Sequence, residues 1–169
     1  MMAKAMFKFT RLGVLAYVLA LGIVALDQLS KFWVLNALQL PQVGQIDVLP
    51  FFDLTMVWNR GVSFGMLRAD ADLARWGLAA FQLVVAIILA VWARKADRKL
   101  LALALGMVIG GALGNLIDRV RFGAVVDFLD FTGLYFPWVF NVADSAITIG
   151  VILLIADSIF QPKVLKTPQ

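Results

Sequence analysis

The segment LLALALGMVIGGALGNLI, residues 100–117, decides the fold class of this chain. It contains no charged residue and is long enough to cross the hydrocarbon core of a bilayer as a helix, which takes about 20 mostly apolar residues. Gly106, Gly110 and Gly114 recur every four residues and therefore predict close packing against another helix. The segment predicts a transmembrane helix inside a bundle.

Three further windows have the same character and predict an α-helical integral membrane protein with four transmembrane helices. These windows cover residues 12–29, 76–93 and 139–160. Of the 169 residues, 62% are hydrophobic and 15% are charged. Soluble domains have about 45–50% apolar and about 25% charged residues. The apolar excess excludes a soluble globular enzyme and predicts a single membrane domain over residues 1–169.

The distribution of Lys and Arg predicts the orientation of the helices. Nine cations fall on one side of the predicted membrane with only Asp97 among them: Lys4, Lys8, Arg11, Arg94, Lys95, Arg98, Lys99, Lys163 and Lys166. On the other side, five arginines are diluted by seven aspartates. By the positive-inside rule, both termini are expected in the cytoplasm. The net charge of +4 is thus interpreted as topology and contact with anionic lipid, not as nucleic-acid binding.

The two predicted outer loops are much longer than the inner connection between the second and third spans, so the functional site is expected on the outer face of the membrane. Within the first, residues 37–74, the segment 45–58 is rich in β-branched and aromatic residues and predicts two or three short strands broken at Pro50. Asn59-Arg-Gly61 then predicts a turn. The second loop, residues 118–138, contains aromatic residues that suit a membrane interface.

Polar residues collect near the outer ends of the predicted spans, although ionisable groups are expensive in lipid. In the fourth window, Asn141, Asp144, Ser145 and Thr148 share one helical face, which either holds helices together or forms a site. Asp144 is the costliest of the four for a purely structural role.

Four other charged residues near the span ends have a structural interpretation. Asp27 and Lys31 are spaced i, i+4 and predict an ion pair, although Lys31 near a lipid phosphate or a substrate carbonyl stays open. Asp118 is adjacent to Arg119, so the two cannot pair across one helical face and each is expected to find another partner.

The missing residue types narrow the chemistry. The chain has no Cys and no His, which excludes thiol nucleophiles, Ser-His-Asp triads and imidazole zinc sites. No closely spaced cluster of aspartates suggests a magnesium site. What remains is the pair Asp127 and Asp144, on segments predicted to meet at the outer leaflet. Two carboxylates that share a site cannot both ionise freely, so one can act as an acid and the other as a base.

Five short motifs, in order along the chain, resemble those of the lipoprotein signal peptidase (signal peptidase II) family. They are Asp27-Gln-Leu-Ser-Lys31, Asn59-Arg-Gly61, Gly110-Gly-Ala-Leu-Gly-Asn-Leu-Ile-Asp-Arg119, Val125-Val-Asp-Phe128 and Phe140-Asn-Val-Ala-Asp-Ser-Ala-Ile147. The similarity extends over about residues 12–160. It implies a small extracytoplasmic β-sheet and a short periplasmic helix in the two outer loops.

The resemblance implies an aspartyl endopeptidase of the bacterial inner membrane, with its active site near the periplasmic leaflet. Such an enzyme removes the signal peptide of a prolipoprotein just before the diacylglyceryl-modified cysteine. It implies that Asp127 and Asp144 form the catalytic dyad. Positions around the substrate and the dyad are Asn59, Gly111, Asn115, Arg119, Asn141 and Ala143. Structural or supporting positions are Asp27, Lys31, Asp118 and Gly61.

We expect no metal and no organic cofactor. The expected partners are the lipid-modified prolipoprotein and membrane lipid, and a monomer is expected, although the glycine pattern would also suit packing between two copies. The loop 37–74 is expected to act as a lid over the site.

Two alternatives from other classes stay open at this point. The first is a small transporter or channel subunit in which intramembrane carboxylates relay ions. The second is a scaffold or chaperone that binds lipid-modified peptides without cutting them.

Overall fold

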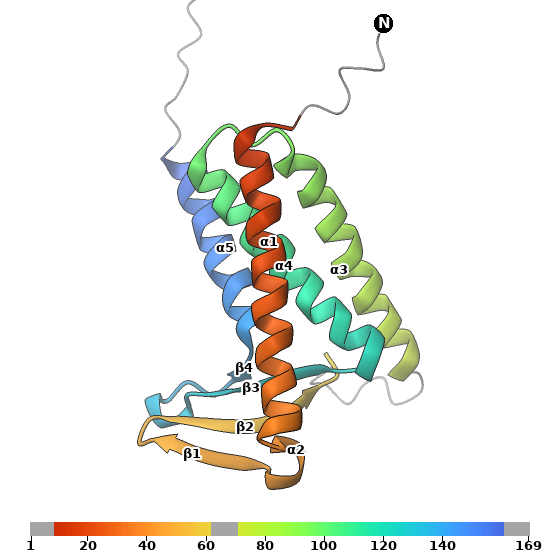
Figure 1. Ribbon diagram of the computed structural model, residues 1–169, viewed down its shortest axis with the longest axis vertical. Helices are drawn as coiled ribbons and strands as arrows, with labels where there is room; N and C mark the ends of the chain where they lie inside the picture. Colours follow the sequence, from red (N-terminus) through yellow and green to blue (C-terminus); the bar gives the residue numbers. More distant parts are fainter. Residues whose placement is uncertain (1–8, 62–70, 161–169) are drawn as a thin grey trace, which may run out of the picture.

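A computed structural model of the chain describes residues 9–61 and 71–160. In this part of the chain, four helical segments are long and apolar enough to cross a membrane, as predicted. They are α1 (Arg11–Phe32, continued by the π-helical turn η2, Trp33–Ala37), α3 (Ala71–Ala93), α4 (Lys99–Phe122) and α5 (Val142–Ile159). A small sheet lies across one end of the four helices, and we call this end of the molecule the sheet end (Figure 1).

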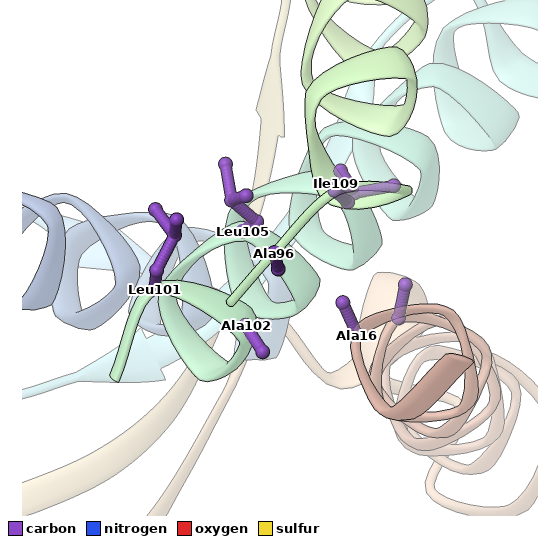
Figure 2. Packing of buried hydrophobic residues seen from close by; sticks show 8 residues of the cluster. Ala16, Ala96, Leu101, Ala102, Leu105 and Ile109 are labelled. Carbon is purple, nitrogen blue, oxygen red and sulfur yellow. The ribbon is translucent and has the colours of Figure 1, made fainter. Parts of the chain in front are cut away.

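Helix α4 lies at the centre of the bundle and packs against α1, α3 and α5. The predicted glycine contacts are present. A Cβ added to Gly106 would lie 2.6 Å from the carbonyl oxygen of Ala16, and one added to Gly110 would lie 2.7 Å from that of Ala20. Small residues dominate the core near the far end of the bundle, where Ala16, Ala96 and Ala102 cluster with Leu101, Leu105 and Ile109 (Figure 2). The helices approach closely because little side-chain volume separates them.

The sheet has four antiparallel strands in the order β1 (Gln45–Leu49), β2 (Phe52–Asn59), β3 (Val125–Asp130) and β4 (Val139–Phe140). Strands β1 and β2 flank Pro50, which agrees with the strands predicted over 45–58. Strands β3 and β4 come from the second outer loop, where the residue pattern alone predicted no strand, although the family resemblance implied a sheet in the two outer loops. Two short helical turns, α2 (Leu40–Val43) and η3 (Thr132–Leu134), complete this end.

An apolar cluster joins the sheet to the bundle. Val34 of η2 and Leu40 of α2 pack with Leu54 of β2 and with Val126 and Phe128 of β3, and all five are buried. Because this cluster holds β3 against the ends of the helices, it fixes the position of Asp127, which lies between Val126 and Phe128.

The element boundaries differ from the windows of the sequence analysis at the sheet end. Helix α4 continues past residue 117 to Phe122 and ends at Gly123, whose φ of +75° is in the left-handed region that favours glycine. Asp118 and Arg119 are therefore helical residues and not part of a loop. Helix α5 begins at Val142 and not at residue 139, because Val139–Phe140 pair with β3 and Asn141 is extended.

The lid expected in the loop 37–74 includes residues 62–70, which lie outside the described residues. The part of this loop before Gly61 forms α2, β1 and β2.

Candidate active site

The carboxylates of Asp127 and Asp144 come from different elements and meet at the junction of the sheet and the bundle. Asp127 lies in the middle of β3, opposite Val57 of β2, and is 1% exposed. Asp144 lies in the first turn of α5 and is half-buried. The predicted pair is therefore brought together because β3 and α5 both pack against α4.

Asn141 connects the two aspartates. As the N-cap of α5, its side-chain oxygen accepts a hydrogen bond from the Asp144 backbone N–H (2.8 Å), and its own N–H donates to the Asp144 carboxylate (3.3 Å). This is a capping box. The Asn141 Nδ2 also donates to Asp127 Oδ1 at 2.6 Å. Asn141 was predicted on the polar face of the fourth span, but it is the cap of α5 because its backbone is extended and not helical.

Two further asparagines orient the carboxylates. Asn59, the last residue of β2, donates from Nδ2 to Asp127 Oδ2 (2.9 Å), while its Oδ1 accepts from the N–H of Gly61 (2.8 Å). The predicted turn is thus present, and the same side chain also orients the Asp127 carboxylate. Asn115 of α4 donates to Asp144 Oδ1 (2.7 Å) and accepts from Asn141 Nδ2 (3.1 Å). Each carboxylate is therefore held by amide donors from two separate segments.

A buried ionic cluster supports this network from behind. The ammonium of Lys31 lies 2.9 Å from Asp27 and 2.7 Å from Asp118, and the three side chains are at most 2% exposed. The predicted i, i+4 pair is present, and Asp118 has found its partner on another helix.

The acids of this cluster also bind the backbone of the two segments that carry the dyad. Asp27 Oδ1 accepts from the N–H of Ala143 (3.0 Å), and Asp118 Oδ2 accepts from the N–H of Val126 (3.0 Å). Lys31 also donates to Asn115 Oδ1 (3.3 Å). The cluster thus anchors the residues that precede Asp127 and Asp144 in the chain.

Gly111 and Ala143 form a close helix contact. A Cβ at Gly111 would collide with the carbonyl oxygen of Ala143, so α4 and the start of α5 approach here without an intervening side chain. The contact sets the distance at which Asn115, one turn further along α4, meets Asp144. These two positions therefore act on the site through packing.

Arg119 supplies positive charge beside the pair. Its guanidinium donates to Gln82 Oε1 of α3 (2.9 Å) and interacts electrostatically with both Asp127 and Asp144. Gln82 was missed in the sequence analysis. The signal was present, because Gln82 is a polar residue in the otherwise apolar run of residues 76–93, and such residues usually face the interior of a bundle. Gln28, which donates to Asp27 and Asp118, was missed as well.

The environment of Asp127 favours its protonated form. Burial, together with the nearby charge of Asp144, raises the pKa of Asp127 from 3.8 to about 6, and the hydrogen bonds from Asn59 and Asn141 only partly oppose the rise. This direction agrees with the expectation for an aspartate flanked by apolar residues. The pair can therefore hold one proton up to about pH 6, which is the state that acid–base chemistry by two carboxylates uses.

An apolar pocket of about 320 Å³ adjoins Asp144. It is lined by Phe136, Trp138, Phe140, Asp144, Ser145, Thr148 and Ile149. A carboxylate at the edge of an apolar pocket can act on a polar bond within a largely hydrophobic substrate. Among the residues that the structure describes, no three carboxylates converge as they would around a metal ion.

Charged groups at the opposite end of the bundle form a separate contact. Asp157 of α5 lies 2.9 Å from the guanidinium of Arg98. Asp157 thus takes part in an ion pair and lies at the end of the bundle away from the dyad.

The fold has four helices long and apolar enough to cross a membrane, and a pair of carboxylates held by asparagine side chains lies at the sheet end. These features define an integral membrane protein with a candidate acid–base site. The model of the signal peptidase (SPase) II family matches residues 19–160. The lipoprotein signal peptidase of Caulobacter vibrioides is 54% identical over 150 residues, which cover 88% of this chain and 89% of the relative. That of Rhodopseudomonas palustris is 42% identical over 163 residues, covering 94% of this chain and 98% of the relative.

Solved structures give the same result. One, described as a bacterial membrane enzyme at 2.3 Å resolution, is 29% identical, with a TM-score of 0.75 and coverage of 97% of this chain and 98% of that one. A second, at 1.9 Å, has 30% identity and a TM-score of 0.76, with coverage of 92% and 98%. The chain belongs to the signal peptidase II family. It is thus a membrane peptidase of the lipoprotein signal peptidase class.

Proposed function

We propose that this chain is an intramembrane aspartyl endopeptidase that removes the signal peptide from diacylglyceryl-modified bacterial prolipoproteins, cutting just before the lipidated cysteine. The observation that carries the proposal is the pairing of Asp127 with Asp144 through Asn141, which bonds both residues. The second support is the apolar pocket beside Asp144, which suits a substrate with acyl chains and an apolar signal helix.

The proposed reaction is a hydrolysis by a water molecule held between the carboxylates. Asp144 borders the open pocket and takes a proton from the water, whose oxygen attacks the scissile carbonyl carbon. Asp127 is buried and holds a proton, which it gives to the departing amine as the carbon–nitrogen bond breaks. A bound substrate would exclude water and raise the pKa of Asp127 further above about 6. Asn59, Asn115 and Asn141 keep the two carboxylates oriented throughout.

A cleavage assay tests the dyad. Purified protein in detergent is incubated with a diacylglyceryl-modified prolipoprotein, and the loss of the signal peptide is followed as a gel shift. We expect Asp127→Asn and Asp144→Asn each to abolish cleavage while substrate binding is retained. The matched control is Asp47→Asn, which changes an exposed carboxylate on β1 and should cleave like the wild type.

Each other outcome of this assay has a defined meaning. Cleavage that survives both dyad substitutions would move the chemistry to other residues. Binding without cleavage by the folded wild type would favour the scaffold alternative. A strong metal chelator is expected to leave cleavage unchanged, and its inhibition of the wild type would contradict the mechanism.

The proposed location is the bacterial inner membrane, with both termini in the cytoplasm and the sheet in the periplasm. The support is the predicted cationic side, which lies at the end of the bundle away from the sheet. Its described members are Arg11 at the start of α1, and Arg94, Lys95, Arg98 and Lys99 from the end of α3 to the start of α4. Reporter fusions at each terminus test it: an alkaline phosphatase active at either terminus would contradict this orientation.

A further inference from the structure

A second pocket at the sheet end lies on the side of the bundle formed by α1 and α4, and it includes neither member of the dyad. It has a volume of about 280 Å³. The last turn of α1 and the π-helical turn form one wall, the end of α4 forms the other, and Trp58 of β2 lies at the sheet side. The residues that matter for its chemistry are Gln28, Phe32, Asn36, Trp58, Arg121 and Phe122.

Arg121 gives this pocket an available positive charge. A guanidinium has five N–H donors. In Arg121, the Nη1 nitrogen donates a long hydrogen bond of 3.4 Å to Gln28 Oε1. The guanidinium carbon of Arg121 lies 4.9 Å from the centre of the Phe122 ring. Within residues 9–61 and 71–160, no carboxylate lies within 4.0 Å of Arg121. The other cation of the pocket, Lys31, is already bound to Asp27 and Asp118 behind the wall.

The surroundings of the pocket are those of a membrane interface. Trp58 and Phe122 pack edge to face with ring centres 5.7 Å apart and are each about two-fifths exposed (42% and 41%). Tryptophan and other aromatic residues favour the level of the lipid headgroups. Below the pocket, α1 presents exposed apolar side chains, Leu29 at 66% and Phe32 at 63%. A ligand here would meet a cation at the interface and an apolar surface along the helix.

We propose that this pocket binds a phospholipid of the leaflet at the sheet end. Arg121 binds the phosphate, because a guanidinium suits the geometry of phosphate oxygens and forms charge-assisted hydrogen bonds with them. Trp58 and Phe122 flank the glycerol region, and the acyl chains follow the exposed face of α1. The ligand class is thus a diacyl phosphodiester lipid. The site is separate from the dyad and does not depend on the proposed reaction.

Native mass spectrometry of the purified full-length protein tests this site with dioleoyl phosphatidylglycerol as the probe. We expect the affinity of the tightest bound lipid to fall about tenfold in Arg121→Gln, the scale of one charge-assisted contact. Lys99→Gln, which removes an exposed charge at the opposite end of α4, is the matched control and should retain the wild-type affinity. Equal affinities of the two variants would overturn the proposal.

Two further arms separate the lipid from other occupants. Dioleoylglycerol, which lacks the phosphate, should bind at least tenfold more weakly than the phospholipid; equal binding would reduce the site to an apolar surface. Millimolar inorganic phosphate should not displace the lipid, and complete displacement would identify free phosphate as the ligand. Asn36→Trp, at an exposed position on the pocket wall, should block binding while Arg121 is intact, and wild-type binding by this variant would place the lipid elsewhere.

Discussion

Replacing Asp127 by Asn should abolish cleavage and yet make the protein more stable at neutral pH. In the folded protein, the pKa of Asp127 is raised from 3.8 to about 6, first by burial and then by the charge of Asp144. The folded state therefore binds the proton of Asp127 more tightly than the unfolded state does. Below about pH 4 the residue is protonated in both states, and above about pH 6 it is ionised in both. Stability is lost as the pH rises between these values.

The size of this effect follows from the pKa shift. At about 1.4 kcal/mol per pKa unit, a rise from 3.8 to about 6 corresponds to about 3 kcal/mol of lost stability above pH 6. Asparagine is neutral at every pH and avoids the loss. The asparagine side chain has one carbonyl oxygen, so it can accept only one of the two hydrogen bonds that Asn59 and Asn141 donate. The lost hydrogen bond costs about 1 kcal/mol of stability. The net gain of about 2 kcal/mol corresponds to a rise in melting temperature of about 4–8 °C.

Thermal unfolding in detergent at pH 7.5 and pH 4 measures this difference. We expect Asp127→Asn to melt above the wild type at pH 7.5 and within about 2 °C of it at pH 4. Asp47→Asn, on an exposed position of the same sheet, should follow the wild type at both pH values. A variant that melts below the wild type at pH 7.5, or a difference that does not depend on pH, would refute the reasoning.

Three further substitutions test the support of the site. Lys31→Met leaves Asp27 and Asp118 buried without a cation and should cost about 3–5 kcal/mol of stability, measured as a large fall in melting temperature. The exposed Lys99→Met is the control. Adding Asp27→Asn to Lys31→Met should restore part of the lost stability. Gly111→Ala forces α4 away from Ala143 and should lower both stability and kcat. Gly77→Ala is the control: no atom lies within 4 Å of the added Cβ, so this change should stabilise α3 by up to about 1 kcal/mol. Similar effects of the two substitutions would argue against the packing role of Gly111. Asn59→Ala removes the hydrogen bond to Asp127 Oδ2 and should lower kcat/KM about tenfold with little change in melting temperature, while the exposed Asn36→Ala should leave kcat/KM unchanged.

Much of the architecture follows from short-range properties of the sequence. The length and hydropathy of four windows determine the number of spanning helices, because a bilayer leaves few alternatives to a helix for an apolar segment of that length. Spacing within one helix is equally direct: Asp27 and Lys31 pair as i, i+4 neighbours, and Gly106, Gly110 and Gly114 of α4 face α1. The candidate carboxylates were identified because the chain offers few other groups for acid–base chemistry.

Only the tertiary structure shows how the carboxylates are held. The residue pattern alone did not predict strand β3, because its pairing partner β2 is far away in the chain. The Asn59–Asp127 hydrogen bond joins residues 68 positions apart. The cap at Asn141 was assigned to the helix because hydropathy does not report where the backbone stops being extended.

The roles of Gln28 and Gln82 were also not predicted, because each forms a hydrogen bond with a residue of another helix that local sequence does not identify. Local sequence therefore determined which segments enter the membrane and which residues bear charge. The long-range packing of β3 and α5 against α4 decided which of those charges meet, because a contact between distant residues depends on the position of every element between them.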